Sequence, residues 1–377
     1  MEEQKGAPMR AWNRTRLADR LGIEYPIIQG PLGGLASQRL AADVSNFGGL
    51  GSFGAHGLAP DAIREVIAEI RGLTSKPFAM NLWVSMEDEG AFGSDEAAFA
   101  RSLAPLARHI EAVGGALPAY KPYVPMRFTD QARVLLEAKV PVFSFIYGIP
   151  PREILEECRL QSIVIVGTAT TPDEARALQD AGVDVVVASG FEAGGHRGSF
   201  LRPAEESLTG TFSLVPQVVD AVEAPVAAAG GIADARGIVA ALALGAEGVQ
   251  IGTAFLTCVG SGASRLHQEA LLSGKAGRTT LTKGVTGRLA RGIDNFLIEE
   301  LNAPGVEILP YPLQRALVKN LSAPAEAAGR ADLVPLWAGQ SANLSHGTDA
   351  ATLLQKLVSE VSSIAGDVRR WRSAERL

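Results

Sequence analysis

The stretch SIVIVGTATTPDEARALQDAGVDVVVASG, residues 162–190, decides the fold. A short apolar run opens it, an amphipathic helical pattern follows at 171–182, and a second apolar run closes it. Thr171 and Pro172 are typical of a helix start, and Gly182 is typical of a helix end. Continuous apolar runs indicate parallel strands that are buried on both faces. The stretch is therefore predicted to be a strand–helix–strand unit.

The same alternation of apolar runs and helical patterns extends in both directions along the chain. Helical spacing predicts helices at 60–72 and 234–245, among others. Eight strand–helix units predict an α/β fold, a closed (β/α)8 TIM barrel, and an open doubly wound sheet is the alternative. The predicted strands cover residues 26–29, 50–53, 77–81, 140–146, 162–166, 183–188, 225–229 and 248–251.

The barrel domain is expected to span residues 1–260. An inserted segment at 84–139 is longer than one strand–helix unit needs, and we expect a loop at 86–94 and two helices there. Residues 261–377 are predicted to form a mainly helical C-terminal extension that packs on the barrel and contributes to the substrate side. Its last helix is expected near 350–372.

Composition excludes several classes of protein. A hydrophobic share of 47% with 20% charged residues indicates a globular chain and excludes a disordered or fibrous one. The net charge of -6, with no basic run, excludes nucleic acid as an expected partner. The two cysteines, Cys158 and Cys258, form no disulfide framework or metal motif. With no apolar leader and no unbroken apolar span, we expect a cytoplasmic protein without membrane contacts. A homodimer is compatible with these features.

The densest glycine cluster after a strand is VASGFEAGGHRGSF, residues 187–200, and it contains His196. Barrel enzymes carry their active sites at this end of the strands, and a neutral imidazole can transfer a proton near neutral pH. His196 is therefore the predicted catalytic residue. Candidate partners for its ring are Asp43, Asp184 and Glu192. The remaining histidines are expected at the surface: His56, His109, His267 and His346.

Two further glycine turns follow the seventh and eighth strands, AAGGIAD at 228–234 and QIGTAF at 250–255. Such turns in late barrel loops bind phosphate through backbone N–H groups. After the first strand, Gly30–Pro31–Leu32 could lie against a flat ring, and the amide of Asn81 suits the polar edge of a heterocycle. FMN would fit all of these features, and a phosphorylated substrate fits them equally well. No carboxylate cluster predicts a metal site.

At these motifs the chain resembles the nitronate monooxygenase family, formerly called 2-nitropropane dioxygenases, and within it the class I branch. The resemblance runs from about residue 17 to about residue 345. It is carried by QGPLGGLAS (29–37), SNFGGLGSFG (45–54), FAMNLWV (78–84), GTATTPDEA (167–175), GFEAGGHRGSF (190–200), AAGGIADARG (228–237) and GVQIGTAFL (248–256), and by the segments LPYPLQ and PLWAGQ.

The resemblance implies an FMN-dependent barrel enzyme that oxidises alkyl nitronates, such as propionate 3-nitronate, with O2 to a carbonyl compound and nitrite. It implies one-electron transfer through a flavin semiquinone, with His196 as the base or as the group that positions the nitronate. Gln340 is a further candidate for a flavin contact. The implied FMN contacts are Gly30, Pro31, Leu32, Asn81, Ser189, Gly194, Ala229, Gly230, Gly231, Gln250, Ile251, Gly252 and Thr253. The alternative on the same scaffold is an NAD(P)H-dependent quinone reductase or enoyl-acyl-carrier-protein reductase.

Overall fold

The computed structural model describes residues 11–84, 93–122, 124 and 126–374. Within these residues, eight parallel strands form one sheet in the order β1-β9-β8-β6-β5-β4-β3-β2. The expected loop at 86–94 lies mostly outside the described residues. The strands are β1 (Ile27–Gln29), β2 (Gly51–Gly54), β3 (Phe78–Trp83), β4 (Val142–Ile146), β5 (Val164–Ala169), β6 (Val185–Ser189), β8 (Val226–Ala229) and β9 (Gly248–Ile251). All eight predicted strands are confirmed, with bounds shifted by a few residues.

The two edges of this sheet meet, so the sheet is a closed barrel. Ile28 of β1 forms a parallel bridge with Leu50, and the Gln29 amide donates to the Leu50 carbonyl at 2.9 Å. The fully buried side chain of Gln29 continues the seam, since its Nε2 donates to the carbonyl of Ser52 at 2.9 Å. A glutamine at this place provides both donor and acceptor where the backbone ladder is short. The open-sheet alternative is therefore wrong.

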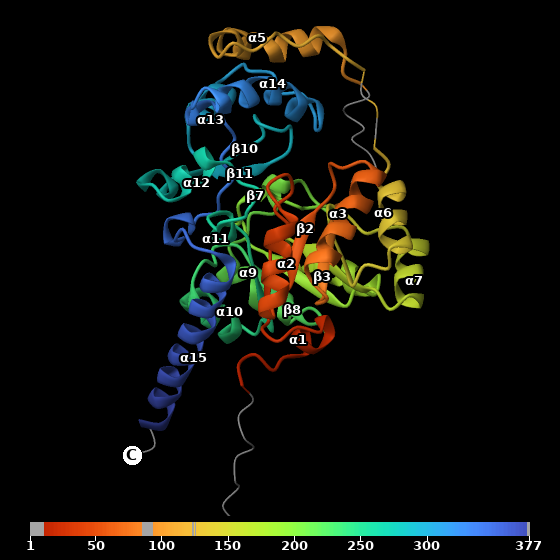
Figure 1. Cartoon of the computed structure of the whole chain (residues 1–377), viewed down its shortest axis with the longest axis vertical. Coiled ribbons are helices and arrows are strands. Elements are labelled where there is room, and N and C mark those ends of the chain that lie inside the picture. The colour runs from red at the N-terminus through yellow and green to blue at the C-terminus, as the bar shows by residue number, and fades with distance from the viewer. Residues whose placement is uncertain (1–10, 85–92, 123, 125, 375–377) are drawn as a thin grey trace, which may run out of the picture.

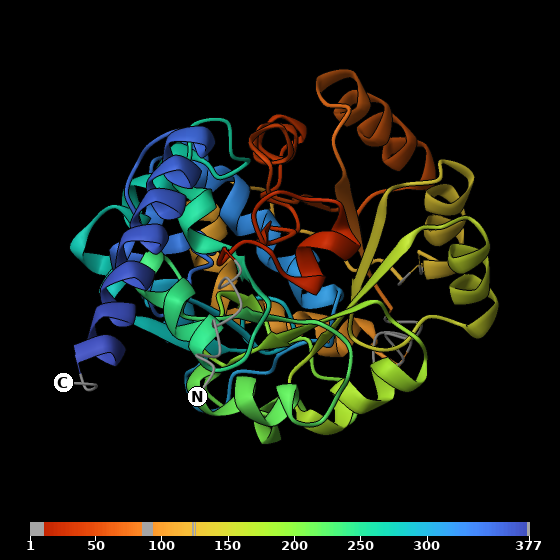
Figure 2. The ribbon, with the colours of Figure 1, turned by 90° about the horizontal axis from the view of Figure 1, so that it is seen from below.

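Helices surround the barrel (Figure 2). The predicted capping is present, because the side chain of Thr171 accepts from the Glu174 amide and that of Asp234 accepts from the Arg236 and Gly237 amides. The helices are α2 (Gln38–Phe47), α3 (Pro60–Leu73), α6 (Phe128–Glu137), α7 (Arg152–Leu160), α8 (Pro172–Asp180), α9 (Thr211–Val219), α10 (Ala235–Ala243) and α15 (Ala350–Ala374).

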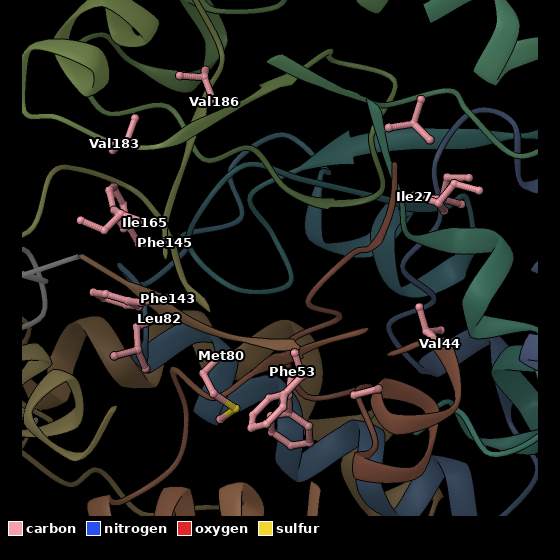
Figure 3. Packing of buried hydrophobic residues seen from close by; sticks show 14 of the residues in the cluster. Ile27, Val44, Phe53, Met80, Leu82, Phe143, Phe145, Ile165, Val183 and Val186 are labelled. Carbon is pink, nitrogen blue, oxygen red and sulfur yellow. The ribbon is translucent and has the colours of Figure 1, made fainter. Parts of the chain in front are cut away.

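Helix α15 occupies the eighth position of the ring, although the sequence placed it in the extension. It packs against α10 and α2, and Leu353, Leu354, Leu357 and Val361 belong to the same apolar cluster as the barrel strands. Ten members of this cluster, on strands and surrounding segments, are labelled in Figure 3. The segment between β9 and α15 is therefore an insertion within the last strand–helix unit rather than a terminal appendage.

The insertion builds a second layer over the carboxyl ends of the strands (Figure 1). It contains α11 (Thr253–Leu256), α12 (Arg265–Leu271), β10 (Thr279–Thr282), β11 (Ala290–Ile293), α13 (Phe296–Leu301) and α14 (Leu313–Ala327), and it is joined by α5 (Glu96–Ala112) from the earlier inserted segment. Leu106 and Ile110 of α5 share one buried apolar cluster with Leu317 and Leu321 of α14. We call this second layer the cap.

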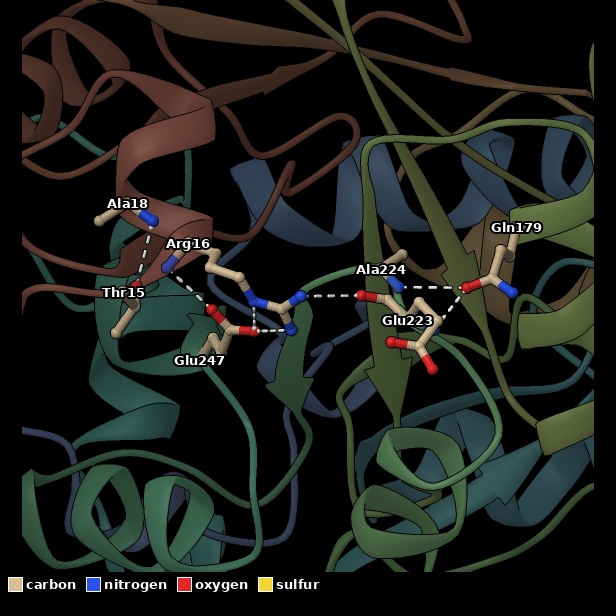
Figure 4. Close-up of polar contacts among 7 residues, drawn as sticks. All are labelled: Thr15, Arg16, Ala18, Gln179, Glu223, Ala224 and Glu247. Atoms are coloured by element: carbon tan, nitrogen blue, oxygen red, sulfur yellow. Dashed lines mark hydrogen bonds and ion pairs between the residues drawn. The ribbon is translucent and has the colours of Figure 1, made fainter.

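The opposite end of the barrel is closed by the short helix α1 (Arg16–Leu21). Leu17 and Leu21 of α1 pack into the apolar barrel interior together with Ile28 and Val166. At the surface of this end, Arg16 Nε donates to Glu247 Oε1 at 2.9 Å, and Arg16 Nη1 donates to the Glu223 carbonyl at 3.1 Å (Figure 4). This end is closed by apolar packing and surface charge pairs.

Among the described residues, no helix combines the length and the apolar character that crossing a bilayer requires.

Candidate active site

A cavity of about 420 Å³ lies between the carboxyl ends of the barrel strands and the cap. This volume falls within the range of about 300–1,000 Å³ that is usual for small-molecule sites. The structure brings together at this cavity every predicted site residue except Ile251 and Gln340. Those that line it are Gly30, Pro31, Leu32, Asn81, Ser189, Gly194, His196, Ala229, Gly230, Gly231, Gln250, Gly252 and Thr253.

Two of the residues proposed as flavin contacts lie away from the cavity lining. Ile251 is fully buried in the barrel core, and its carbonyl accepts from the Gly30 amide at 2.7 Å. Gln340 is exposed, and its amide donates to the Glu192 carbonyl at 2.9 Å. Its neighbours Gly339 and Ser341 line the cavity instead. The periodicity of a strand explains Ile251, since successive side chains point to opposite faces.

The glycine turns form one wall of the cavity from backbone atoms. Gly230 and Gly231 have φ values of 102° and 70°, which only glycine adopts without strain. A Cβ added at Gly252 would lie 3.7 Å from Leu32 Cδ2, its one non-adjacent neighbour within 4 Å among the described residues, so the space in front of this turn is open. An anionic group can approach such turns closely through backbone N–H groups.

Asn81 places an amide at the same wall. It is buried, and its Nδ2 donates to Ser144 Oγ at 3.0 Å. Within the described part of the chain, its Oδ1 has no hydrogen-bond partner. A buried acceptor without a partner is costly unless a ligand supplies a donor. The open turns and this acceptor together fit a heterocycle that carries a phosphate, such as FMN.

His196 lies on the short strand β7 (Gly195–His196), which pairs with β11 of the cap. Its Nε2 is 2.9 Å from Thr286 Oγ1, and its ring meets the edge of the Trp83 ring with 4.8 Å between centroids. Burial lowers the pKa of His196 well below its ordinary value, and electrostatic interaction with His56, Arg288 and Arg315 lowers it further. The imidazole is therefore neutral near pH 7.

Buried charged side chains hold the loop that carries His196. Arg197 donates from Nε to the Ser207 carbonyl at 3.1 Å and also bonds the Ser189 carbonyl. Glu174 accepts from the Thr170 and Phe200 amides, each at 2.6 Å. These contacts fix the backbone on both sides of His196.

None of the three predicted partners of His196 contacts its ring. Glu192 instead accepts from the Thr211 amide at 2.9 Å. Asp184 accepts from the Ile165 amide at 2.8 Å, and Asp43 pairs with Arg39 one helical turn away. The hydroxyl of Thr286 takes the place of the expected carboxylate. The sequence could not show this contact, because Thr286 is 90 residues from His196.

Two histidines expected at the surface are not there. His56 lines the cavity and stacks on Trp83 with 3.8 Å between ring centroids. Burial lowers the pKa of His56 to about 3, and the positive charges of Arg315 and Arg288 contribute. His267 is buried, with its Nε2 2.9 Å from the Trp337 carbonyl. His56 follows the end of β2 and Trp83 ends β3, so their position at the carboxyl ends of strands was the signal available.

The cap supplies the second wall of the cavity, and sequence reasoning missed its residues. Arg315, Val318 and Lys319 on α14 line the cavity at the spacing of one helix face. The guanidinium of Arg315 lies over barrel loops, since Cβ atoms added at Gly34 and Gly57 would lie 3.6 and 3.5 Å from it. Arg288 lies over the rings of Tyr147 and Tyr311, 4.4 and 4.7 Å from their centroids.

Comparison with known proteins gives a consistent result. Residues 14–360 match the family model described as nitronate monooxygenase. The chain is 40% identical over 356 residues to a protein of Staphylococcus aureus (strain Newman) named "Probable nitronate monooxygenase", with 94% of this chain and 99% of that protein covered.

Solved structures give the same picture. The nitroalkane oxidase from Streptomyces ansochromogenes is 35% identical, with a TM-score of 0.84 over 94% of this chain and all of that one. FabK from Thermotoga maritima is 29% identical, with a TM-score of 0.74 over 95% of this chain and 99% of that one.

Proposed function

The chain belongs to the nitronate monooxygenase family and is an oxidoreductase, and from that premise we propose FMN-dependent oxidation of alkyl nitronates by O2. The products are a carbonyl compound and nitrite, and propionate 3-nitronate is the proposed type of substrate. The observation that carries the proposal is one cavity lined both by open glycine turns at the ends of the barrel strands and by the cationic side chains of Arg315 and Lys319 from the cap.

The residues of the barrel wall suit FMN. The turns at Gly230–Gly231 and Gly252 would hold its phosphate, and Asn81 Oδ1 would accept from a ring N–H group. Bound FMN would supply the one-electron redox chemistry that side chains lack. The chain itself would bind the substrate between this wall and the cap, exclude water with Trp83 and Trp337, and place His196 beside the substrate.

The charge of the cap favours an anionic substrate. Arg315 and Lys319 line the cavity, and no carboxylate in the described residues forms an ion pair with Arg315. Propionate 3-nitronate carries a carboxylate in addition to its nitronate, and an arginine can bind such a group with two hydrogen bonds.

One experiment separates this function from reduction by a nicotinamide, the alternative on the same scaffold. The purified protein is mixed anaerobically with propionate 3-nitronate and, separately, with NADH and NADPH. We expect the visible flavin absorption bands to change when the nitronate is added and to stay unchanged with either nicotinamide. Full bleaching by a nicotinamide, with the nitronate inert, would assign a reductase. A protein without flavin bands even after addition of FMN would remove the cofactor from the proposal.

A further inference from the structure

Thr286 lies directly behind His196, in the connection between β10 and β11. It is 3% exposed. Its hydroxyl oxygen has three polar neighbours, namely His196 Nε2 at 2.9 Å, the Arg288 carbonyl at 3.1 Å and the Arg288 amide at 3.3 Å. The other ring nitrogen of His196, Nδ1, has no hydrogen-bond partner among the residues that the structure describes.

The three neighbours of the hydroxyl determine where the histidine proton lies. A hydroxyl donates one hydrogen and accepts two, an amide can only donate, and a carbonyl can only accept. All three contacts of Thr286 form together only if its hydrogen goes to the Arg288 carbonyl. The oxygen then accepts from the Arg288 amide and from an N–H at Nε2 of His196. With the hydroxyl hydrogen on Nε2 instead, the contact to the carbonyl is lost, which disfavours that arrangement in a buried site.

We propose that Thr286 is a positioning residue that keeps the ring proton of His196 on Nε2 and leaves Nδ1 as the atom that acts as base toward a neutral nitroalkane. This inference rests on the proposed function. In the proposed step the α-carbon–hydrogen bond breaks, the electron pair stays on the substrate as a nitronate, and the proton moves to Nδ1. The imidazolium so formed keeps its Nε2–H bond to Thr286.

The same geometry predicts a difference between two substrates with one carbon skeleton. Nitroethane must lose a proton to Nδ1, so its oxidation depends on the tautomer. Ethyl nitronate is already deprotonated, and a lone pair at Nδ1 offers it no hydrogen bond. The Thr286 hydroxyl should therefore matter for nitroethane and matter little for ethyl nitronate.

The tautomer can be read by nitrogen-15 NMR on the purified protein labelled at its five histidines. The signals of His196 are assigned by their loss in His196→Asn. We expect a protonated Nε2 and an unprotonated Nδ1 in the wild type, and a mixture of tautomers in Thr286→Val, which keeps the shape and removes the hydroxyl. A wild-type Nδ1 that carries the proton would overturn the proposal. This measurement needs no turnover.

Kinetics with both substrates give the second measurement. Thr286→Val should lower kcat/KM for nitroethane about tenfold, the effect expected for losing one buried hydrogen bond, and leave kcat/KM for ethyl nitronate near its wild-type value. Thr286→Ser should restore the rate. Thr282→Val is the matched control, because this buried threonine bonds Asn302 instead of His196.

The outcomes separate the two proposals. Equal losses for both substrates in Thr286→Val would assign the residue a structural role and refute the inference. A wild type that oxidises ethyl nitronate and not nitroethane would also refute it while leaving the proposed function intact. A wild type inactive on both would refute the proposed function, and the NMR result would still decide the tautomer.

Discussion

The two walls of the cavity are built in different ways. The barrel wall presents backbone groups and small residues such as Gly230, Gly231 and Gly252 at the ends of strands. The cap wall presents large and charged side chains, with Arg315 on α14 and Trp337 among them. A wall of backbone amides can hold one rigid group in one place, whereas a wall of side chains can vary with the substrate. We infer that the barrel wall fixes the cofactor and that the cap wall selects the substrate.

The largest effect should follow from filling the barrel wall. Gly252→Glu would place a side chain and a negative charge in the open space in front of the proposed phosphate turn, so we expect complete loss of flavin and of activity. Gly252→Ala is the matched control, since in the described part of the chain the nearest non-adjacent atom to an added Cβ is Leu32 Cδ2 at 3.7 Å. Flavin absorbance relative to protein absorbance measures the result. A fully flavin-loaded Gly252→Glu protein would place the phosphate elsewhere.

The next largest effect should follow from replacing His196, which lies at the cavity between the two walls. His196→Asn should keep bound flavin and lower the turnover of nitroethane about 10²–10⁴-fold, the scale of lost acid–base catalysis. His346→Asn, a change at an exposed histidine, should leave turnover unchanged. Steady-state oxygen consumption measures both variants. Wild-type turnover in His196→Asn would show that the reaction does not use this residue.

The difference between the walls also explains what the sequence could predict. Each barrel-wall residue lies at the end of the strand that is next to it in sequence, so the pattern of strands predicts its position. The segments are 187–200 at the end of β6, 228–234 at the end of β8 and 250–255 at the end of β9. Parallel strands align their carboxyl ends at one edge, and hence these loops had to meet. The flat-ring segment after β1 and Asn81 on β3 followed from the same rule.

The cap wall obeys no such rule. The helical pattern around residues 350–372 showed an amphipathic helix, but periodicity does not reveal which surface covers an apolar face, so α15 was not recognised as a barrel helix. Arg315 and Thr286 reach the cavity through an insertion whose path is set by packing against α5. Contacts between residues that far apart in sequence depend on the tertiary fold, which a single sequence does not display.

A smaller effect should test the cap wall as a selector. Arg315→Gln should raise KM for propionate 3-nitronate about tenfold, as expected for losing one charge-assisted hydrogen bond, and should leave KM for ethyl nitronate, which has no carboxylate, nearly unchanged. Arg152→Gln is the control, since that side chain is 86% exposed on α7. Steady-state kinetics at constant ionic strength measure KM. Equal increases for both substrates would assign Arg315 to general electrostatics.

His56, which stacks on Trp83, should affect how the free energy of unfolding depends on pH. Because the pKa of His56 is about 3 in the folded chain and about 6.5 unfolded, the unfolded state binds the proton first as the pH falls. The free energy of unfolding is therefore undiminished above about pH 6.5 and decreases towards pH 3. His56→Gln should flatten this slope by up to about 1.4 kcal/mol per pH unit. Urea unfolding between pH 5 and 8 measures it, and an unchanged slope would contradict the buried neutral ring.

The smallest effect should follow from a change at the end of the barrel that is closed by α1, away from the cavity. Arg16→Gln breaks the pair with Glu247, but the Arg16 side chain is 63% exposed, and exposed ion pairs contribute at most about 1 kcal/mol. We expect a loss of stability within that limit, weaker still at high salt, with flavin content and KM unchanged. Urea unfolding at low and high salt measures the loss. A change in KM would show that the end of the barrel closed by α1 is coupled to the cavity. Substrate binding would then depend on this end as well as on the two walls.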